Sequence, residues 1–365
     1  MSLLDRYIIR QYIVAAFFGL LSFLCIFLVI DLTEKIDDFL DAGVPVNIIL
    51  EYYVVFAPEI LKLMTPVAML LAALFVTGRL ASQNELAAMK SSGISLYRLL
   101  FPFLAVATVV AGVSIWLNGW VVPSSNQKKF YIERTYLRKG GDVGSKFNIF
   151  FQVGQTRVVS MNYFDTQTRT ASRVSILDFA DTNLTVLYHR FDAFQMQWQA
   201  ASDSLAEGWV LVNGTHRGTV DLTNPVIQYQ RMYVGKLSLV PDDIEKKQRK
   251  PDEMQYGELR EFIAGQVAAG QDVSRWLVDY HAKLAFPFAS VIMVLFGVPF
   301  ATSRPRTGTA LGFGIAVAVT FIYLAFMKIS QVFGYNGDLN PLLTAWLANL
   351  IFLAAAVVNL VRVQK

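Results

Sequence analysis

Six hydrophobic segments constrain this chain more than any other feature of its sequence. They lie at about residues 11–30, 53–77, 100–121, 284–302, 308–330 and 342–361. Because a membrane-spanning helix needs about 20 mostly apolar residues, each segment predicts one such helix. The first is expected to stay as a helix and not to be cleaved as a signal peptide, since acidic residues follow it and no small-x-small cleavage site is present. Of the 365 residues, 54% are hydrophobic and only 16% charged, a composition typical of a membrane protein.

The short connections between these segments predict the orientation of the chain. Arginine and lysine gather before the first helix, between the second and third, between the fourth and fifth, and at the end of the chain, whereas residues 31–41 carry five acids against Lys35. Basic loops stay in the cytoplasm. We therefore expect both termini and the loop at residues 84–98 to be cytoplasmic. The basic residues concerned are Arg6, Arg10, Arg79, Lys90, Arg98, Arg304, Arg306, Arg362 and Lys365.

The remaining block, about residues 123–280, is then expected to lie outside the cytoplasm. Its hydrophobic pattern alternates, as in TRVVSMNYF, SRVSILDF and TVLYHRFDAFQMQW, with Asn213-Gly214 as a turn signal. Alternation of this kind predicts an antiparallel sandwich or jelly roll. A linking helix at about residues 255–269 follows it. The predicted organisation is helices one to three in residues 1–122, the β domain in 123–280 and helices four to six in 281–365.

Several kinds of site are not indicated by the sequence. The single Cys25 cannot form a disulfide within the chain, and the three histidines are widely spaced without acidic or cysteine neighbours at ligand spacing, so no metal site is predicted. The stretch VGKLS resembles the end of a phosphate-binding loop, but Gln230 and Leu237 stand where glycine and serine or threonine are needed. No GxSxG elbow is present. The histidines are His189, His216 and His281.

Basic residues near the outer ends of the first three helices form a candidate binding rim. Charges inside or beside a membrane are expensive and therefore informative. Together these residues could line an opening suited to a phosphorylated amphiphile. The alternative is a collar of lysines that extend to the lipid headgroups, including an ion pair between Glu59 and Lys62 on one helix face. The rim residues are Lys35, Lys62, Lys129 and Arg134.

The cytoplasmic loop NELAAMKSSGISLYR is expected to contain a short helix at about residues 80–95. Ser82 and Glu85 are spaced as a capping box, and Gly93 is placed to end the helix. Leu86 and Met89, with Leu80 before them, form an apolar stripe that could enter a groove on another protein. The alternative is an ordinary amphipathic helix lying on the membrane.

Small residues recur every four positions at the start of the fifth helix, at Gly308, Gly312 and Ala316. This spacing allows close approach of a second helix and is typical of packing surfaces in membranes. It is therefore a candidate surface for sealing against a partner subunit.

The chain resembles the lipopolysaccharide-export permeases of the LptF/LptG (YjgP/YjgQ) type over essentially its whole length. The resemblance rests on LLDRYIIRQY at the start, TGRLASQNELAAMKSSGISLYRLL after the second helix, WVVPSSNQ after the third and YHAKLAFPFASVIMVLFGVPF in the fourth. The cytoplasmic loop is its most specific part, and the LDRY start favours the G type. The fold implied is an α-helical membrane protein with six transmembrane helices, three before and three after an inserted periplasmic all-β jellyroll-like domain.

The resemblance also implies a function for the chain. It would be a permease subunit, not an enzyme, of an ATP-driven exporter in the inner membrane of Gram-negative bacteria. The exporter takes lipopolysaccharide from the outer leaflet and passes it to a periplasmic bridge. Implied partners are a second LptF/LptG-type permease, a cytoplasmic ATPase dimer of the LptB type that carries ATP and magnesium, and jellyroll partners of the LptC and LptA types. No cofactor on this chain and no nucleic acid are implied.

Site residues follow from the same resemblance. The loop helix would be the coupling helix that docks into the ATPase, with Glu85, Leu86, Met89 and Gly93, and the acid at Glu85 would contact the ATPase. Basic residues near the outer ends of the helices would meet lipid phosphates, with Lys35, Lys62, Lys129 and Arg134 as the nearest matches. The identity of the partner permease stays open.

Two other functions remain open on the sequence alone. One is the permease of another ATP-coupled lipid or lipoprotein exporter, although in those families the outer domain usually follows the first helix and not the third. The other is a periplasmic scaffold that the helices only anchor, for which a patterned cytoplasmic loop would be unnecessary.

Overall fold

The computed structural model describes residues 3–137, 149–165, 168–180, 185–200, 207–218, 226–237, 239–241, 244, 250–268, 272–303 and 309–362. The chain forms two compact units. The membrane unit comprises Met1–Phe130, Pro251–Tyr256 and Ser274–Lys365, and the β unit comprises Tyr131–Lys250 and Gly257–Val273.

Six helical stretches in the described residues are long and apolar enough to cross a membrane, which confirms the six predicted spans. The third and fourth spans are each made of several consecutive helical elements, which include the short π-helix η1 (Leu117–Val121). The spans and their elements are α1 (Leu3–Asp41), α2 (Val46–Ser82), the run from α4 (Leu96–Trp116) through η1 and α5 (Val122–Ile132) to η2 (Glu133–Leu137), the run from α8 (Ser274–Ala285) through η4 (Phe286–Phe288) to α9 (Ala289–Ser303), α10 (Thr309–Tyr335) and α11 (Pro341–Arg362).

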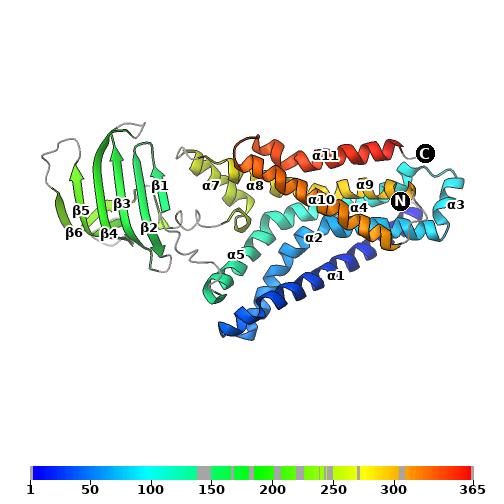
Figure 1. Ribbon diagram of the computed structural model, residues 1–365, viewed down its shortest axis with the longest axis horizontal. Helices are drawn as coiled ribbons and strands as arrows, with labels where there is room; N and C mark the ends of the chain where they lie inside the picture. The colour runs from blue at the N-terminus through cyan, green and yellow to red at the C-terminus, as the bar shows by residue number, and fades with distance from the viewer. Residues whose placement is uncertain are drawn as a thin grey trace. The chain divides into compact units, whose positions relative to one another are not determined.

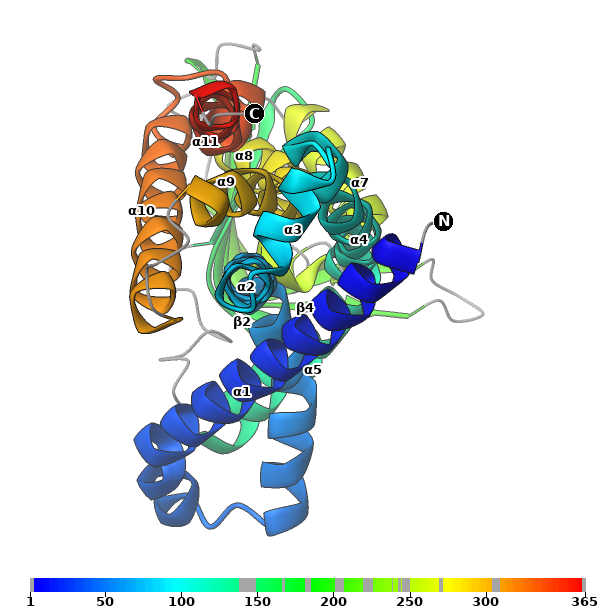
Figure 2. The same ribbon diagram turned by 90° about the vertical axis from the view of Figure 1, so that its right-hand side faces the viewer.

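Helices α2 and α9 lie at the centre of the membrane unit. Helix α9 packs against α2, α4 and α11, and α2 packs in addition against α1 and α10 (Figure 2). The two central helices approach closely at Gly297, where a Cβ would lie 2.4 Å from Cδ1 of Leu70. A small residue at such a crossing allows the van der Waals contact that drives helix association in lipid.

The predicted glycine surface at the start of the fifth span is only partly described. Gly308 lies outside the described residues, and Gly312 lies within α10, where nothing is described of its surroundings. Ala316 is fully buried and belongs to an apolar cluster with Leu70 of α2 and Met293 of α9. The described end of this stripe therefore packs within the chain, and sealing against a partner subunit stays a prediction.

A buried polar network joins α8, α10 and α11. The hydroxyl of Tyr323 donates to Oδ1 of Asn349 at 2.8 Å, and Nδ2 of Asn349 donates to the carbonyl oxygen of Ala285 at 2.7 Å. Both Tyr323 and Asn349 are buried. Because an unpaired amide would be costly in an apolar environment, these bonds fix how the three helices pack.

The two termini and the short helix α3 (Glu85–Ser91) lie at one end of the membrane unit (Figure 1). The connection from α1 to α2 lies at the other end of the unit, beyond Asp41. The candidate coupling residues of α3 thus lie at one end of the unit, whereas Lys35, near the end of α1, lies toward the other.

The β unit contains a six-stranded antiparallel sheet in which every strand pairs with its neighbours in sequence. This meander, inserted between the third and fourth spans, confirms the predicted inserted all-β domain. The described strands make one sheet and not the two packed sheets of a sandwich. They are β1 (Ile149–Val153), β2 (Arg157–Asp165), β3 (Thr170–Phe179), β4 (Leu187–Gln199), β5 (Gly208–Gly218) and β6 (Ile227–Gly235), followed by η3 (Pro251–Glu253) and α7 (Tyr256–Ala268).

Asn213-Gly214 is not a turn, and that prediction is wrong. Both residues lie inside β5, where Gly214 pairs with Ala193 on β4 and with Tyr229 on β6. Asn213 has φ of 52°, a left-handed conformation that asparagine tolerates better than most residues. The strand is distorted at this point, but its neighbours on both sides keep it in the sheet.

One face of the sheet carries the core of the β unit. Trp209 is fully buried among Met161, Phe164 and Met196, and its Nε1 donates to the carbonyl oxygen of Leu239 at 2.6 Å. The buried indole therefore has its donor satisfied, as buried tryptophans usually do.

Candidate functional site

Helix α3 connects α2 to α4 and begins differently from the prediction. Helix α2 continues through Ser82, whose hydroxyl donates back to the carbonyl oxygen of Arg79 at 2.9 Å. The residue before α3 is Asn84, which has φ of 59° and makes no side-chain cap hydrogen bond. The predicted capping box is therefore wrong: Ser82 belongs to the preceding helix, and Glu85 is the first residue of α3.

The predicted end of this helix at Gly93 is confirmed by its main-chain geometry. Gly93 has φ of 83°, its N–H donates to the carbonyl oxygen of Lys90, and the N–H of Ile94 donates to that of Met89, both at 3.0 Å. These two bonds form a Schellman motif, which satisfies the last carbonyl groups of the helix. Helix α3 thus has a fixed length and direction.

The apolar stripe on this helix is mostly used inside the chain. Leu86 is 4% exposed and Leu80 is fully buried, and both lie in the core between α1, α2, α4 and α9. The prediction that the whole stripe could enter a groove on another protein is wrong for these two residues, because they anchor α3 to the membrane unit. Met89 packs against the same core only partly.

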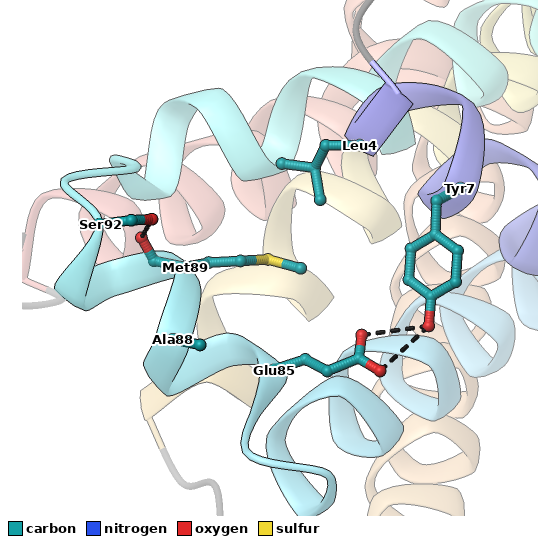
Figure 3. Close-up of a pocket in the computed structure, with 6 residues that line it drawn as sticks. All are labelled: Leu4, Tyr7, Glu85, Ala88, Met89 and Ser92. Atoms are coloured by element: carbon teal, nitrogen blue, oxygen red, sulfur yellow. Dashed lines mark hydrogen bonds between the residues drawn. The ribbon is translucent and has the colours of Figure 1, made fainter.

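An open hollow of about 380 Å³ lies between α3 and the start of α1. Its lining residues are Leu4, Tyr7, Glu85, Ala88, Met89 and Ser92, and the side chains of Leu4 and Tyr7 face α3 (Figure 3). The hydroxyl of Tyr7 donates to both carboxylate oxygens of Glu85, each at 3.1 Å. This contact orients the carboxylate at the edge of the hollow, where a basic side chain of a partner could reach it.

An ion pair fixes the start of α1 against the start of α4. Nη1 and Nη2 of Arg98 lie 2.7 and 2.8 Å from the two carboxylate oxygens of Asp5, whose side chain is only 6% exposed. A two-point contact of this kind holds both groups in one geometry. It therefore places Tyr7, two residues further along α1, opposite Glu85.

At the other end of the helices, each candidate lysine is engaged with groups of the chain itself. Nζ of Lys35 lies 3.1 Å from Oδ1 of Asp31, donates to the hydroxyl of Tyr52 and lies over the rings of Tyr52 and Phe56. Lys129 is buried, pairs with Glu59 and lies over the ring of Phe56 at 4.9 Å from its centre. Lys35 and Lys129 therefore meet the same aromatic ring.

Lys62 has a partner that the sequence pattern did not indicate. Its Nζ lies 3.3 Å from Oδ1 of Asp252, in a segment 190 residues away along the chain. The expected pair between Glu59 and Lys62 is not what forms, because Glu59 pairs with Lys129 instead. The structure thus brings Lys35, Lys62 and Lys129 to one end of the membrane unit. Arg134 lies in η2, which belongs to the β unit.

Asp252 belongs to the segment Pro251–Tyr256, which we call the strap. The strap is part of the membrane unit, whereas the residues on both sides of it in sequence belong to the β unit. Sequence reasoning missed it. Two acids after a proline gave no signal that this segment would contact helices so distant in sequence.

Two histidines that are far apart in sequence meet on the sheet. Nε2 of His216 lies 3.2 Å from Nδ1 of His189, and the His216 ring stacks on Phe191 with centres 4.3 Å apart. Their wide spacing in the sequence gave no indication of this contact. Among the described residues no group of three or more potential metal ligands is found.

Comparisons with known proteins agree with this arrangement. The family model described as "Lipopolysaccharide export system permease LptF/LptG" matches residues 6–362. The chain is 23% identical over 343 residues to the lipopolysaccharide export system permease protein LptG of Escherichia coli (strain K12), covering 91% of this chain and 90% of the relative. It is 22% identical to LptG of Haemophilus influenzae (strain ATCC 51907 / DSM 11121 / KW20 / Rd), covering 91% and 89%.

The relatives do not separate the two permease types. LptF of Escherichia coli (strain K12) is also 23% identical, over 363 residues that cover 97% of this chain and 93% of the relative. The family model covers almost the whole chain, and the six spans with an inserted antiparallel sheet agree with it. This chain is therefore a multi-pass membrane protein that belongs to the LptF/LptG family of lipopolysaccharide export system permeases.

Proposed function

We propose that this chain is a permease subunit that exports lipopolysaccharide with energy from a separate ATPase. It would take the glycolipid from the outer leaflet of the inner membrane and pass it to a periplasmic bridge. The family match over residues 6–362 supports the substrate. The observation that carries the ATP-driven mechanism is the fixed helix α3, with the Glu85 carboxylate presented beside an open hollow at one end of the membrane unit.

The proposed orientation puts α3 and both termini in the cytoplasm and the β unit in the periplasm. Basic residues near the α3 end, including Arg79, Lys90 and Arg98, support this assignment, because positive loops stay in the cytoplasm. Location in the inner membrane of a Gram-negative bacterium follows from the same proposal.

The partner for α3 is proposed to be a cytoplasmic ATPase dimer of the LptB type, which binds ATP and magnesium. Glu85 would pair with a basic side chain of the ATPase, and Met89 and Leu4 would supply apolar contact in the hollow. Leu86 packs α3 against the core of the membrane unit, and Gly93 ends the helix. A movement of the ATPase would therefore be transmitted by α3 to α2 and α4. A second LptF/LptG-type permease would form the glycolipid-binding cavity together with this chain. Partners of the LptC and LptA types would accept the glycolipid.

Substitution of Glu85 by alanine tests the coupling role. The purified complex carrying Glu85→Ala is expected to lose most of its lipopolysaccharide-stimulated ATP hydrolysis and lipopolysaccharide transfer in vesicles, while the protein stays folded and in the membrane. Because Glu85 makes no helix-capping bond with Ser82, loss of a cap cannot explain such a result. Lys90→Ala, an exposed charge on the same helix, is the matched control and should behave as wild type.

The result that would overturn the coupling role is wild-type ATP hydrolysis and transfer in Glu85→Ala. Native mass spectrometry of the wild-type complex tests the rest of the proposal, since it reports the ATPase, the second permease and any retained glycolipid. A complex that contains neither an ATPase nor a glycolipid would favour the scaffold function instead.

A further inference from the structure

The strap is bound to three helices by hydrogen bonds, two of them to its main chain and one from the Tyr256 hydroxyl. Nε2 of Gln127 on α5 donates to the carbonyl oxygen of Glu253, and the buried Nζ of Lys283 on α8 donates to that of Met254, both at 2.6 Å. The hydroxyl of Tyr256 lies 3.3 Å from the carbonyl oxygen of Ile115 on α4. These bonds do not depend on any acidic side chain of the strap.

The link from the strap to α2 is of a different kind, because it is an ion pair made by an acidic side chain of the strap. Oδ1 of Asp252 accepts from Nζ of Lys62 at 3.3 Å. The Lys62 side chain is 16% exposed, whereas that of Asp252 is 56% exposed. Lys62 is therefore largely shielded from solvent, whereas its counter-ion Asp252 is accessible to solvent.

The surroundings of Asp252 are strongly basic. The surrounding protein removes part of the water from this carboxyl, which acts to raise its pKa, but Lys62, Lys283 and Lys328 together hold the pKa below its ordinary value. The carboxylate is thus charged at neutral pH, and it occupies a position where positive charge from three helices converges. Such a position suits any anion.

A phosphate monoester would bind there more strongly than a carboxylate. It carries a charge of about −1.5 to −2 at pH 7 and has three acceptor oxygens. The present contact is a single bond to an exposed carboxylate, a type of pair that contributes little. By contrast, both side chains of the Lys129–Glu59 pair are largely shielded from solvent, with exposed fractions of 8% and 24%. A phosphate group would therefore displace Glu59 less readily than Asp252.

We propose that Asp252 is a displaceable counter-ion that holds Lys62 until the phosphate monoester of an amphiphile takes its place. The exchange removes the link from the strap to α2 and leaves the links to α4, α5 and α8 intact. Binding of the phosphate thereby releases α2 from a segment whose two ends continue into the β unit. This inference rests on the proposed function for the identity of the amphiphile, a phosphorylated glycolipid.

The first test measures binding in variants of the full chain, within its purified complex in nanodiscs of phosphatidylcholine. Asp252→Asn should bind lipopolysaccharide more tightly than wild type, by up to about fivefold, because the competing charge is gone. Asp338→Asn, which removes an exposed acid from the loop between α10 and α11, is the matched control for net charge and should bind as wild type. In a Lys62→Gln background the gain from Asp252→Asn should disappear. Equal affinities of Asp252→Asn and Asp338→Asn, or a gain that persists without Lys62, would overturn the proposal.

The second test follows amide hydrogen exchange of residues 252–256 of the strap in the wild-type complex. Lipopolysaccharide and phosphatidic acid, which both carry a phosphate monoester, should raise exchange in the strap, and dephosphorylated lipopolysaccharide should not. Inorganic phosphate that raised exchange at the same concentration would overturn a lipid source for the ligand.

The two proposals fail in different ways in this experiment. An effect of phosphatidic acid without an effect of lipopolysaccharide would keep the exchange at Lys62 and reject the proposed cargo. No effect of either lipid, in a complex that still transfers lipopolysaccharide, would reject the exchange and keep the cargo.

Discussion

Replacing Gly119 by alanine is expected to push the strap away from the helix that carries this glycine. A Cβ at this position would lie 2.3 Å from Cε2 and 2.4 Å from Cδ2 of Tyr256, well inside an ordinary carbon–carbon contact of about 3.5–4 Å. The ring has little freedom to move, because its hydroxyl is hydrogen-bonded and Trp120 packs against it edge-on with centres 5.6 Å apart. Overpacking of this kind destabilises by about 1–3 kcal/mol.

Gly112→Ala, in α4 of the same span, is the matched control. A Cβ there meets no described atom within 4 Å. Both substitutions replace a helical glycine, for which alanine gains up to about 1 kcal/mol in an α-helix, and only Gly119→Ala adds a clash. We expect Gly119→Ala to be less stable than Gly112→Ala by about 1–3 kcal/mol in equilibrium unfolding of the full chain in mixed micelles.

A third variant identifies the clashing group. In a Tyr256→Ala background the ring is absent, and Gly119→Ala and Gly112→Ala should then have equal stability. Two glycine variants that already agree within about 0.5 kcal/mol with Tyr256 in place would refute the close approach of the strap. A difference that persisted without the ring would refute the assignment of the clash to Tyr256.

Two further substitutions test other contacts. Arg98→Ala removes the two-point contact to the buried carboxylate of Asp5 and should lower the melting temperature of the full chain more than Lys90→Ala does, and equal values would contradict a role for the ion pair. Trp209→Phe removes a buried hydrogen bond and volume from the β unit and should destabilise it by about 2–4 kcal/mol, measured by hydrogen exchange of the sheet. Trp198→Phe, at a half-buried site, should cost less, and the reverse order would contradict the described core.

The membrane spans and the strands were predictable because the surrounding medium, lipid or protein core, determines their hydrophobic patterns. Lipid demands long apolar helices wherever the chain crosses it, and a sheet with one buried face demands alternation. Short polar motifs were less informative. Ser82 and Glu85 have the spacing of a capping box, but the same residues also fit the end of one helix and the start of the next, and the left-handed conformation at Asn84 decides between them.

The candidate sites were predictable in part. The end of the short helix at Gly93 followed from local sequence, whereas the contact of Glu85 with Tyr7 joins residues 78 apart and could not be predicted. The partners of the candidate phosphate-binding lysines were even less predictable from local sequence. Local spacing favoured a pair of Glu59 with Lys62, but desolvation and packing gave both residues partners from distant segments. Long-range ion pairs depend on the assembled fold, and no local pattern encodes them.

The pair of histidines on the sheet gives a prediction on pH. Burial lowers the pKa of His216, and the neighbouring His189 lowers this pKa further, while Asp178 acts in the opposite direction. The folded protein therefore binds a proton at His216 less readily than the unfolded chain, whose pKa is about 6.5. By linkage, this stabilisation of the sheet is fully present above that unfolded pKa and is lost as the pH falls below it.

Protection factors for the amides of β4 and β5 in the full chain, corrected for intrinsic exchange rates at pH 7.5 and pH 5.0, measure this effect. Wild type should lose protection at the lower pH, because a further proton would place a positive charge on the partly buried His216, whose Nε2 lies 3.2 Å from the Nδ1 of His189. His216→Phe keeps an aromatic ring that can stack on Phe191 but cannot titrate, so it should lose less protection. Acids elsewhere titrate equally in both proteins, and the difference between them isolates the histidine. An equal loss of protection in wild type and His216→Phe would refute the argument, because the pH dependence would then arise from other groups.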